Sequence, residues 1–171
     1  MPTATESSPI ELLPGFTPRP HTTHVVFDFD GTVAPDVMLS PIFDMIGINP
    51  DLFWDKTRSL TEDGYDREIS YLQALVFICA DKGISLSNSM IRDLGARLQF
   101  YQGFPDILER LKKISSKNGY ELGVYVITAG LEEMVLGSQL GPYLTRCWGC
   151  GFAEEPNGAI LHPKRIVTSA N

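Results

Sequence analysis

The 171-residue sequence predicts an α/β domain built around a parallel sheet, with a helical block inserted after the first strand. An apolar, β-branched run at residues 23–29 reads as a buried strand, and a second such run covers residues 121–127. Between them, residues 33–100 show helical spacing and no strand pattern. Because a strand, a helical stretch and another strand in this order favour right-handed crossovers, we expect the strands to run parallel.

The composition is typical of a globular protein, with 43% hydrophobic and 20% charged residues. A formal net charge of −7 without a long basic run argues against nucleic acid or an anionic membrane as a partner. No apolar run approaches membrane-spanning length, and the first residues resemble no secretory signal. Three cysteines do not suggest a disulfide framework, so we expect a reduced, cytoplasmic protein.

The helical block contains several recognisable helix starts. Ser40-Pro41 and Asn49-Pro50 each place a capping residue before a proline at the first helical position. The helix after Asn49 should end near Gly64, the next should run from Asp66 to just before Gly83, and the third should begin near Asn88. We therefore divide the chain into a flexible extension at 1–22, a core at 23–32 and 101–171, and a helical insertion at 33–100.

The second half of the chain restarts the sheet. A helix is expected at 106–116, followed by the strand at 121–127, which ends in Thr128-Ala129-Gly130 and turns into another helix. A third strand at 146–152 and a short return strand at 159–161 complete the prediction.

Two aspartates follow the first strand and are the most informative residues of the sequence. Asp28 and Asp30 flank one apolar residue, and a strand places such alternate side chains on one face. Ligands bind at the carboxyl ends of strands in open α/β sheets. Two carboxylates there suit Mg²⁺, or a nucleophile paired with a general acid. A polar turn is the simpler alternative, but two acids after so apolar a strand favour a functional site.

Two motifs carry a resemblance to a known family. Asp28-Phe29-Asp30-Gly31-Thr32 resembles the first motif of the haloacid dehalogenase (HAD) superfamily of phosphatases, and Val126-Ile127-Thr128-Ala129-Gly130 resembles its second. The helical block resembles the cap of the phosphoserine-phosphatase-like branch, and residues 24–161 follow this layout. The resemblance implies a three-layer, Rossmann-like parallel sheet with a helical cap.

The resemblance also implies an activity, which is Mg²⁺-dependent hydrolysis of a small phosphomonoester through an aspartyl-phosphate. Asp28 would be the nucleophile and Asp30 the general acid and base, and both would hold the metal, Asp30 through its carbonyl oxygen. The residues implied to bind phosphate are Gly31, Thr32, Thr128, Ala129, Gly130 and Lys164. Thr128 is also compatible with a helix N-cap, and Lys164 is equally compatible with a solvated surface charge.

One part of the family pattern is missing. No aspartate follows Asp106, so the late pair of acids that supplies further metal ligands is absent, and Glu154 and Glu155 lie in an expected turn. The sequence therefore resembles a family member truncated at its C-terminus. The first strand would then be a sheet edge that could pair with another copy. Two alternatives stay open, namely a non-catalytic protein that binds a phosphometabolite or a partner chain, and a phosphotransferase using the same residues.

Two further groups of residues have a functional and a structural interpretation. Cys147 and Cys150 could form a redox or metal pair, but their place in an expected strand favours buried hydrophobic residues. Candidates for substrate contact in the helical block are Trp54, Arg58, Tyr65, Arg67 and Tyr71. For each of these taken singly, ordinary helix surface or core is the simpler interpretation.

Overall fold

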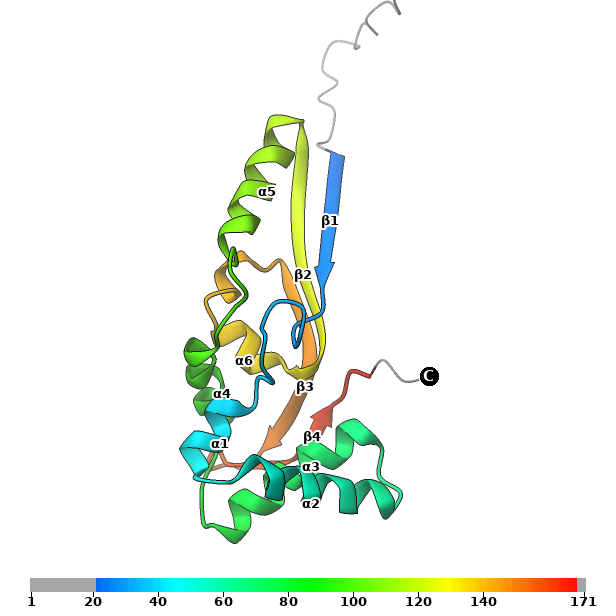
Figure 1. Ribbon diagram of the computed structural model, residues 1–171, viewed down its shortest axis with the longest axis vertical. Coiled ribbons are helices and arrows are strands. Elements are labelled where there is room, and N and C mark those ends of the chain that lie inside the picture. Colours follow the sequence, from blue (N-terminus) through cyan, green and yellow to red (C-terminus); the bar gives the residue numbers. More distant parts are fainter. Residues whose placement is uncertain (1–20, 169–171) are drawn as a thin grey trace, which may run out of the picture.

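A four-stranded sheet organises the molecule, and a computed structural model describes residues 21–168 of the chain (Figure 1). Strands β1 (His21–Phe27), β2 (Tyr120–Leu131) and β3 (Arg146–Glu154) are parallel neighbours in that order. Strand β4 (Ile160–Arg165) pairs antiparallel with β3. The predicted α/β fold with a parallel core is confirmed. Of the expected extension, residues 1–20 lie outside the described residues, and His21 and Thr22 are the first residues of β1.

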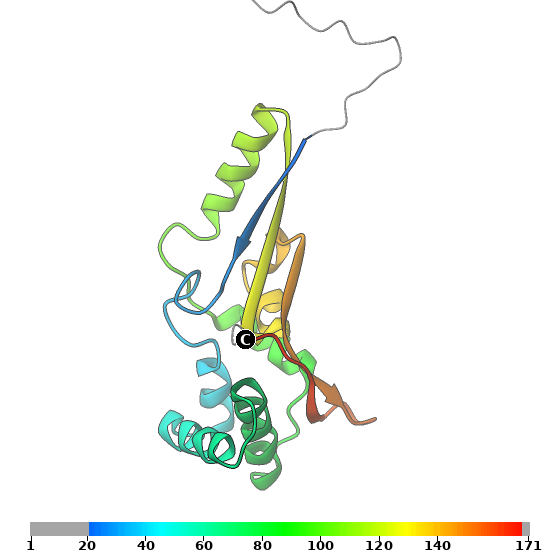
Figure 2. The ribbon, with the colours of Figure 1, turned by 90° about the vertical axis from the view of Figure 1, so that its right-hand side faces the viewer.

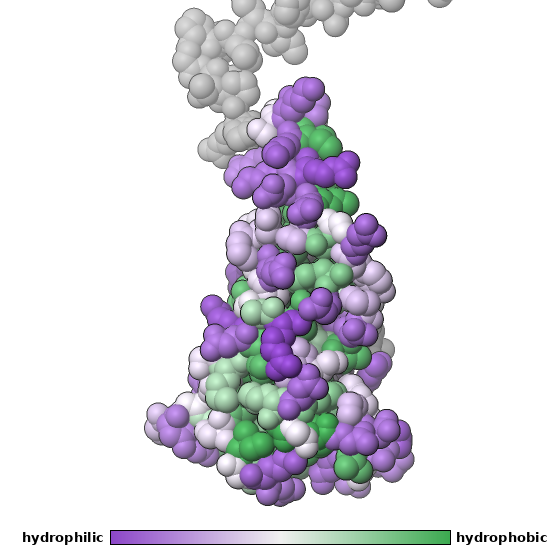
Figure 3. Space-filling model, turned by 60° about the vertical axis from the view of Figure 1, so that its left-hand side comes forward, coloured by the Kyte–Doolittle hydropathy of each residue, from purple (hydrophilic) through white to green (hydrophobic). Residues whose placement is uncertain are grey.

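Helices cover one face of the parallel strands. Helix α5 (Asp106–Lys117) packs against β2, and α6 (Glu132–Gly137) packs against β3, both on the same side of the sheet (Figures 1 and 2). On the other face, Val26 is 54% and Ile127 46% exposed. Residues 21–168 therefore form two of the three expected layers. Figure 3 shows the helical side, where polar side chains are scattered among apolar ones.

The inserted block contributes four helices with two different packing partners. Helices α2 (Pro50–Glu62) and α3 (Arg67–Asp81) pack against each other as a helical hairpin. Helix α4 (Asn88–Leu94) packs mainly against α6, and α1 (Ser40–Ile46) is a short helix beside α4. Two 3₁₀ turns lie at Gly95–Arg97 and Gly141–Tyr143. The α2–α3 hairpin is thus the part of the insertion that stands apart from the helices on the sheet (Figure 2).

Two of the expected helix starts have different outcomes. Asn49 caps α2 as predicted, because its side-chain oxygen accepts a 2.8 Å hydrogen bond from the Asp51 N–H. The prediction that Ser40 caps α1 is wrong, since the N-cap is Leu39. The Ser40 hydroxyl instead donates a hydrogen bond to the carbonyl oxygen of Val37.

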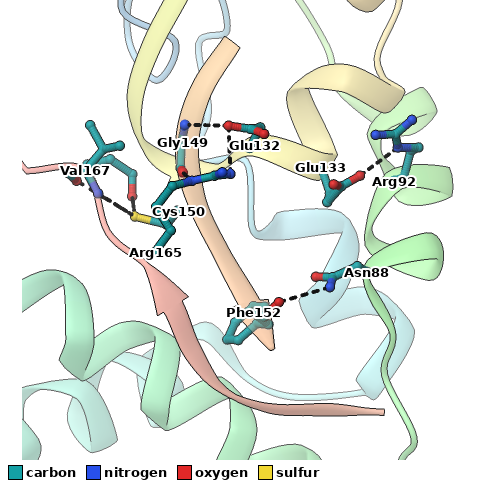
Figure 4. Close-up of polar contacts among 10 residues, drawn as sticks. Asn88, Arg92, Glu132, Glu133, Gly149, Cys150, Phe152, Arg165 and Val167 are labelled. Carbon is teal, nitrogen blue, oxygen red and sulfur yellow. Dashed lines mark hydrogen bonds and ion pairs between the residues drawn. The ribbon is translucent and has the colours of Figure 1, made fainter. Parts of the chain in front are cut away.

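The contact between α4 and α6 depends on glycine. A Cβ atom at Gly137 would clash with the carbonyl group of Arg92, and one at Gly95 would clash with that of Met134. The two helices can therefore approach closely at these points. Arg92 of α4 also forms an ion pair of 2.6 Å with Glu133 of α6 (Figure 4). The segment that carries the α2–α3 hairpin is thereby fixed to the helical layer of the sheet.

Candidate active site

A cavity of about 840 Å³ lies where the ends of β1 and β2 meet the α2–α3 hairpin. Its lining brings together three parts of the chain that are far apart in sequence. The core contributes Asp28, Asp30, Ile127, Thr128, Ala129, Gly130, Val167 and Thr168, and the loop before α1 contributes Val37, Met38 and Leu39. The helical hairpin contributes Trp54, Thr57, Arg58, Thr61, Arg67, Glu68 and Tyr71.

The two aspartates reach the cavity because the chain turns sharply after β1. Between them, Phe29 is fully buried, and its carbonyl oxygen accepts hydrogen bonds from the N–H groups of Thr32, Val33 and Ala34. Gly31 allows this turn with a φ of 75°, a left-handed conformation that glycine adopts without strain. The anchored Phe29 leaves Asp28 and Asp30 on the cavity side.

The carboxylates of Asp28 and Asp30 have different surroundings. Asp28 is exposed, whereas Asp30 is partly buried and accepts a 3.1 Å hydrogen bond from the Met38 N–H. Burial raises the pKa of Asp30 to about 6, and the nearby charge of Asp28 adds to this increase, while the Met38 hydrogen bond opposes it. Asp30 can therefore hold or release a proton near neutral pH, as a general acid and base must.

The second motif has a different backbone from the one predicted. Strand β2 continues through Thr128, Ala129 and Gly130 to Leu131, and α6 begins only at Glu132. The expectation that Thr128 caps a helix, with Ala129 and Gly130 at its N-terminus, is therefore wrong. An irregularity in the pairing with β3 lies between Ile127 and Leu131.

Thr128 nevertheless has the features of an anion-binding residue. Its side chain lines the cavity, and its Oγ1 accepts a 3.0 Å hydrogen bond from the Gly130 N–H. Since the hydroxyl acts as acceptor in this bond, its own hydrogen remains available for an oxygen atom in the cavity. The site thus offers one oriented hydroxyl beside the two carboxylates.

The peptide group between Ala129 and Gly130 is held from both ends. Its N–H bonds to Thr128, and its carbonyl oxygen accepts hydrogen bonds from the Tyr71 hydroxyl at 2.7 Å and from the Cys150 thiol at 3.2 Å. Burial raises the pKa of Tyr71 well above its usual range, with Cys150 adding to the effect, so the hydroxyl remains a donor. Figure 4 shows Cys150 also bound to the backbone of Val167.

The other candidate residues from the sequence divide into two groups. Gly31, Thr32 and Lys164 are exposed and do not line the cavity, although Gly31 and Thr32 directly follow Asp30 in the turn. Of the helical candidates, Trp54, Arg58, Arg67 and Tyr71 do line it, and Tyr65 does not. Arg58 pairs with Asp55 at 2.8 Å, whereas Arg67 forms no ion pair with any residue in the range 21–168.

Met38 and Glu68 are among the cavity residues that sequence reasoning missed. Met38 donates to Asp30 through its N–H and accepts a 2.9 Å contact from the Leu131 N–H on its sulfur, so it joins the two motifs. Nothing in the sequence marks it. Glu68 is only 7% exposed. It precedes the buried Leu72 by one helical turn, so a glutamate on the apolar stripe of α3 was a usable signal.

No group of three or more His, Cys, Asp or Glu side chains that could hold a metal ion is found among residues 21–168. Cys79, Cys147 and Cys150 are all buried and free. Burial raises the pKa of Cys147 to about 12, which leaves it an unreactive thiol. This agrees with the interpretation of Cys147 and Cys150 as buried hydrophobic residues. None of the helices in the described part of the chain is long and apolar enough to cross a membrane.

Known proteins resemble this chain in sequence and in structure. No family model matches the chain. An uncharacterized protein of Borreliella burgdorferi is 27% identical over 147 residues, which cover 80% of this chain and 52% of the relative. A HAD family hydrolase of Salmonella enterica serovar Typhi is similar in structure, with a TM-score of 0.55 at 14% identity over 84% of this chain and 46% of that one.

A phosphoserine phosphohydrolase-like protein of Francisella tularensis also matches, with a TM-score of 0.47 at 18% identity over 84% of this chain and 64% of that one. The chain spans about half the length of the curated relative and of the Salmonella hydrolase. The chain therefore has the fold of the HAD family hydrolases.

Proposed function

We propose that the cavity hydrolyses small phosphomonoesters, with Asp28 as the nucleophile. The observation that carries this proposal is the unequal pair of carboxylates in one cavity, in which exposed Asp28 lies beside Asp30 with its pKa of about 6. A nucleophile must be open to the substrate, and its partner must exchange a proton at working pH. The HAD-like fold of the chain is consistent with this chemistry.

The reaction would follow in two steps. An Asp28 carboxylate oxygen attacks phosphorus, the ester P–O bond breaks, and protonated Asp30 gives its proton to the departing alcohol. Asp30 then takes a proton from a water molecule that attacks the aspartyl-phosphate, so Asp28 and inorganic phosphate are released. Thr128 would donate its hydroxyl hydrogen to a phosphoryl oxygen throughout.

The residues present fit Mg²⁺ in a limited way. The Asp28 carboxylate is exposed, and the carbonyl oxygen of Asp30 accepts no hydrogen bond from other residues of the described chain. Mg²⁺ favours oxygen ligands and keeps several waters, so one or two protein ligands and the substrate phosphate can suffice. When bound, the ion would neutralise charge on the phosphoryl oxygens. We therefore propose that Mg²⁺ binds together with the substrate.

The proposal can be tested by hydrolysis of p-nitrophenyl phosphate with and without MgCl₂. We expect Mg²⁺-dependent activity that falls by about a thousand-fold in Asp28→Asn. Asp36→Asn is the matched control, because Asp36 is exposed in the same loop but does not line the cavity, and should change activity by less than about two-fold. Acid quenching followed by mass spectrometry should find a phosphate adduct on the peptide that contains Asp28.

Other outcomes would favour the alternative functions. Wild-type protein that binds inorganic phosphate in calorimetry but hydrolyses no ester would contradict the enzyme and support a binding protein. An adduct on Asp28 that is discharged to an added alcohol faster than to water would indicate a phosphotransferase. An adduct on any other residue would show that Asp28 is not the nucleophile.

A further inference from the structure

Met38 is a buried residue of the cavity wall that makes one contact with each of the two motifs. Its N–H donates a 3.1 Å hydrogen bond to a carboxylate oxygen of Asp30 in the loop after β1. Its sulfur accepts a 2.9 Å hydrogen bond from the N–H of Leu131, the last residue of β2. One residue therefore links the proposed general acid to the end of the strand that carries Thr128.

The side chain of Met38 occupies a space that Gly130 leaves open. A Cβ atom at position 130 would overlap with the sulfur and the terminal carbon of Met38. The N–H of Gly130 donates to the hydroxyl oxygen of Thr128. The thioether therefore packs directly against the short piece of backbone that orients the Thr128 hydroxyl.

Met38 is also the point at which the loop after β1 returns to the protein interior. Residues 35–37 are exposed, whereas the residues on either side of them are buried. At the near end of this exposed stretch, the Ala34 N–H donates to the carbonyl oxygen of Phe29. The far end is anchored by Met38, and the same residue holds the carboxylate of Asp30.

The sulfur atom gives this anchor its chemistry. A thioether is a weak hydrogen-bond acceptor, and leucine, which has a similar volume, offers no acceptor at all. A change from methionine to leucine keeps the interior filled at small cost in stability. The same change leaves the Leu131 N–H without its sulfur partner, so it separates the hydrogen bond of Met38 from its packing.

We propose that Met38 is a positioning residue, whose sulfur fixes the loop so that the Asp30 carboxylate stays within reach of the departing oxygen while Thr128 holds the phosphate. This inference rests on the proposed function. Asp30 and Thr128 would act on one phosphoryl group from two different strands, so their relative placement must be maintained during the reaction. Met38 acts through Asp30 and takes no part in bond making or breaking.

The test uses two esters whose leaving groups differ in their need for a proton. p-Nitrophenolate leaves readily without one, whereas the more basic phenolate depends on a general acid. Met38→Leu should lower kcat/KM about thirty-fold for phenyl phosphate but only about three-fold for p-nitrophenyl phosphate. A merely structural defect would reduce the amount of active protein and lower both values by the same factor. The ratio of the two values is therefore the decisive measurement.

Two further variants and one spectrum frame this result. Met134→Leu is the matched control, because Met134 is fully buried in α6 but does not line the cavity, and its ratio should stay within about two-fold of the wild type. Asp30→Asn removes the acid itself and should change the ratio at least as much as Met38→Leu does. In NMR spectra of Met38→Leu, the amide proton of Leu131 should move to higher field, because it loses its sulfur acceptor.

The possible failures can be told apart. An unchanged ratio in Met38→Leu, with a changed one in Asp30→Asn, would overturn the inference and leave the proposed function intact. An unmoved Leu131 resonance, or an equal change of the ratio in Met134→Leu, would also overturn the inference, because the sulfur contact would then not be the cause. A wild type that hydrolyses neither ester would overturn the proposed function and the inference together.

Discussion

The hydroxyl of Tyr71 on α3 donates a 2.7 Å hydrogen bond to the carbonyl oxygen of Ala129 at the end of β2. These residues are 58 positions apart in sequence, and the bond joins the helical hairpin to the second motif. The peptide group that it holds also donates through its Gly130 N–H to Thr128. Tyr71 therefore orients, through one peptide group, the hydroxyl that would bind phosphate.

Replacing Tyr71 by phenylalanine tests this positioning role. We expect kcat for p-nitrophenyl phosphate to fall about tenfold with little change in KM, because the Ala129–Gly130 peptide can then rotate and Thr128 loses its fixed direction. The free energy of unfolding should fall by only about 1 kcal/mol. Tyr65→Phe is the control, since Tyr65 is exposed outside the cavity. An unchanged kcat per folded molecule would show that the hydrogen bond is only structural.

The elements of the sheet were predictable because their signals are local. An apolar run ending in Asp28, and another ending in Thr128, mark the two neighbouring strands β1 and β2. The end of β2 was not predictable, because Thr128-Ala129-Gly130 has the composition of a turn. The structure keeps these residues extended through hydrogen bonds from Tyr71 and Cys150, which only the tertiary fold brings near.

The pKa of Asp30 makes stability depend on pH. In the folded chain this pKa is about 6, against an ordinary value of 3.8, so the Asp30 side chain loses its proton at lower pH in the unfolded chain. The contribution of Asp30 to the free energy of unfolding is thus complete below about pH 4 and is lost as the pH rises through about 6. Asn at this position cannot ionise and keeps an oxygen for the Met38 N–H.

Thermal unfolding without divalent ions therefore distinguishes the two side chains. The variant Asp30→Asn should gain Tm relative to the wild type as the pH rises. The difference in Tm between the two proteins should be roughly 2–6 °C larger at about pH 7.5 than at about pH 4, a range that allows for screening of the Asp30 charge by solvent. Asp36→Asn, at an exposed position in the same loop, should show no such trend. A difference that shrinks with rising pH would mean that the Asp30 pKa is lowered and not raised.

Arg165 at the end of β4 fastens this strand to the core. Its Nε donates a 2.8 Å hydrogen bond to the Gly149 carbonyl oxygen, and its Nη2 lies 2.7 Å from a carboxylate oxygen of Glu132 (Figure 4). Arg165→Ala should lower the free energy of unfolding by about 1–2 kcal/mol, because Gly149 and the mostly buried Glu132 each lose a partner. Denaturation in urea measures this change.

Replacement of the adjacent Lys164 provides the matched control. The same variant also tests the phosphate-binding role that the family resemblance implied for Lys164. It is exposed and lies outside the cavity, so Lys164→Ala should change stability by less than about 0.5 kcal/mol. If Lys164 does not neutralise the phosphate, the same variant should leave KM for p-nitrophenyl phosphate unchanged. A rise of about tenfold in KM would restore the role that the family resemblance implied.

Prediction of the candidate site succeeded only where motifs are short and local. Asp28 and Asp30 come just after β1, Thr128 lies within β2, and all three share the cavity as expected. Met38 reaches Asp30 through its backbone N–H, which no side-chain pattern can reveal. Lys164 was chosen by region alone, and it is not among the residues that line the cavity. Charged side chains on the hairpin were visible in the sequence, but their burial depends on how α3 packs.

The edge position of β1 leads to the last prediction, which concerns self-association. In the described sheet β1 pairs only with β2, so its other side carries unpaired backbone groups, and Val26 is 54% exposed. We predict that two copies pair through this strand, giving a concentration-dependent dimer in sedimentation velocity. Val26→Lys should shift the protein to monomer, because a lysine on an edge strand opposes pairing. Ile114→Lys on α5 alters a similarly exposed apolar residue on the helical layer and should leave the dimer intact. A wild type that stays monomeric at all concentrations would contradict this prediction, and equal loss of the dimer in both variants would place the interface elsewhere.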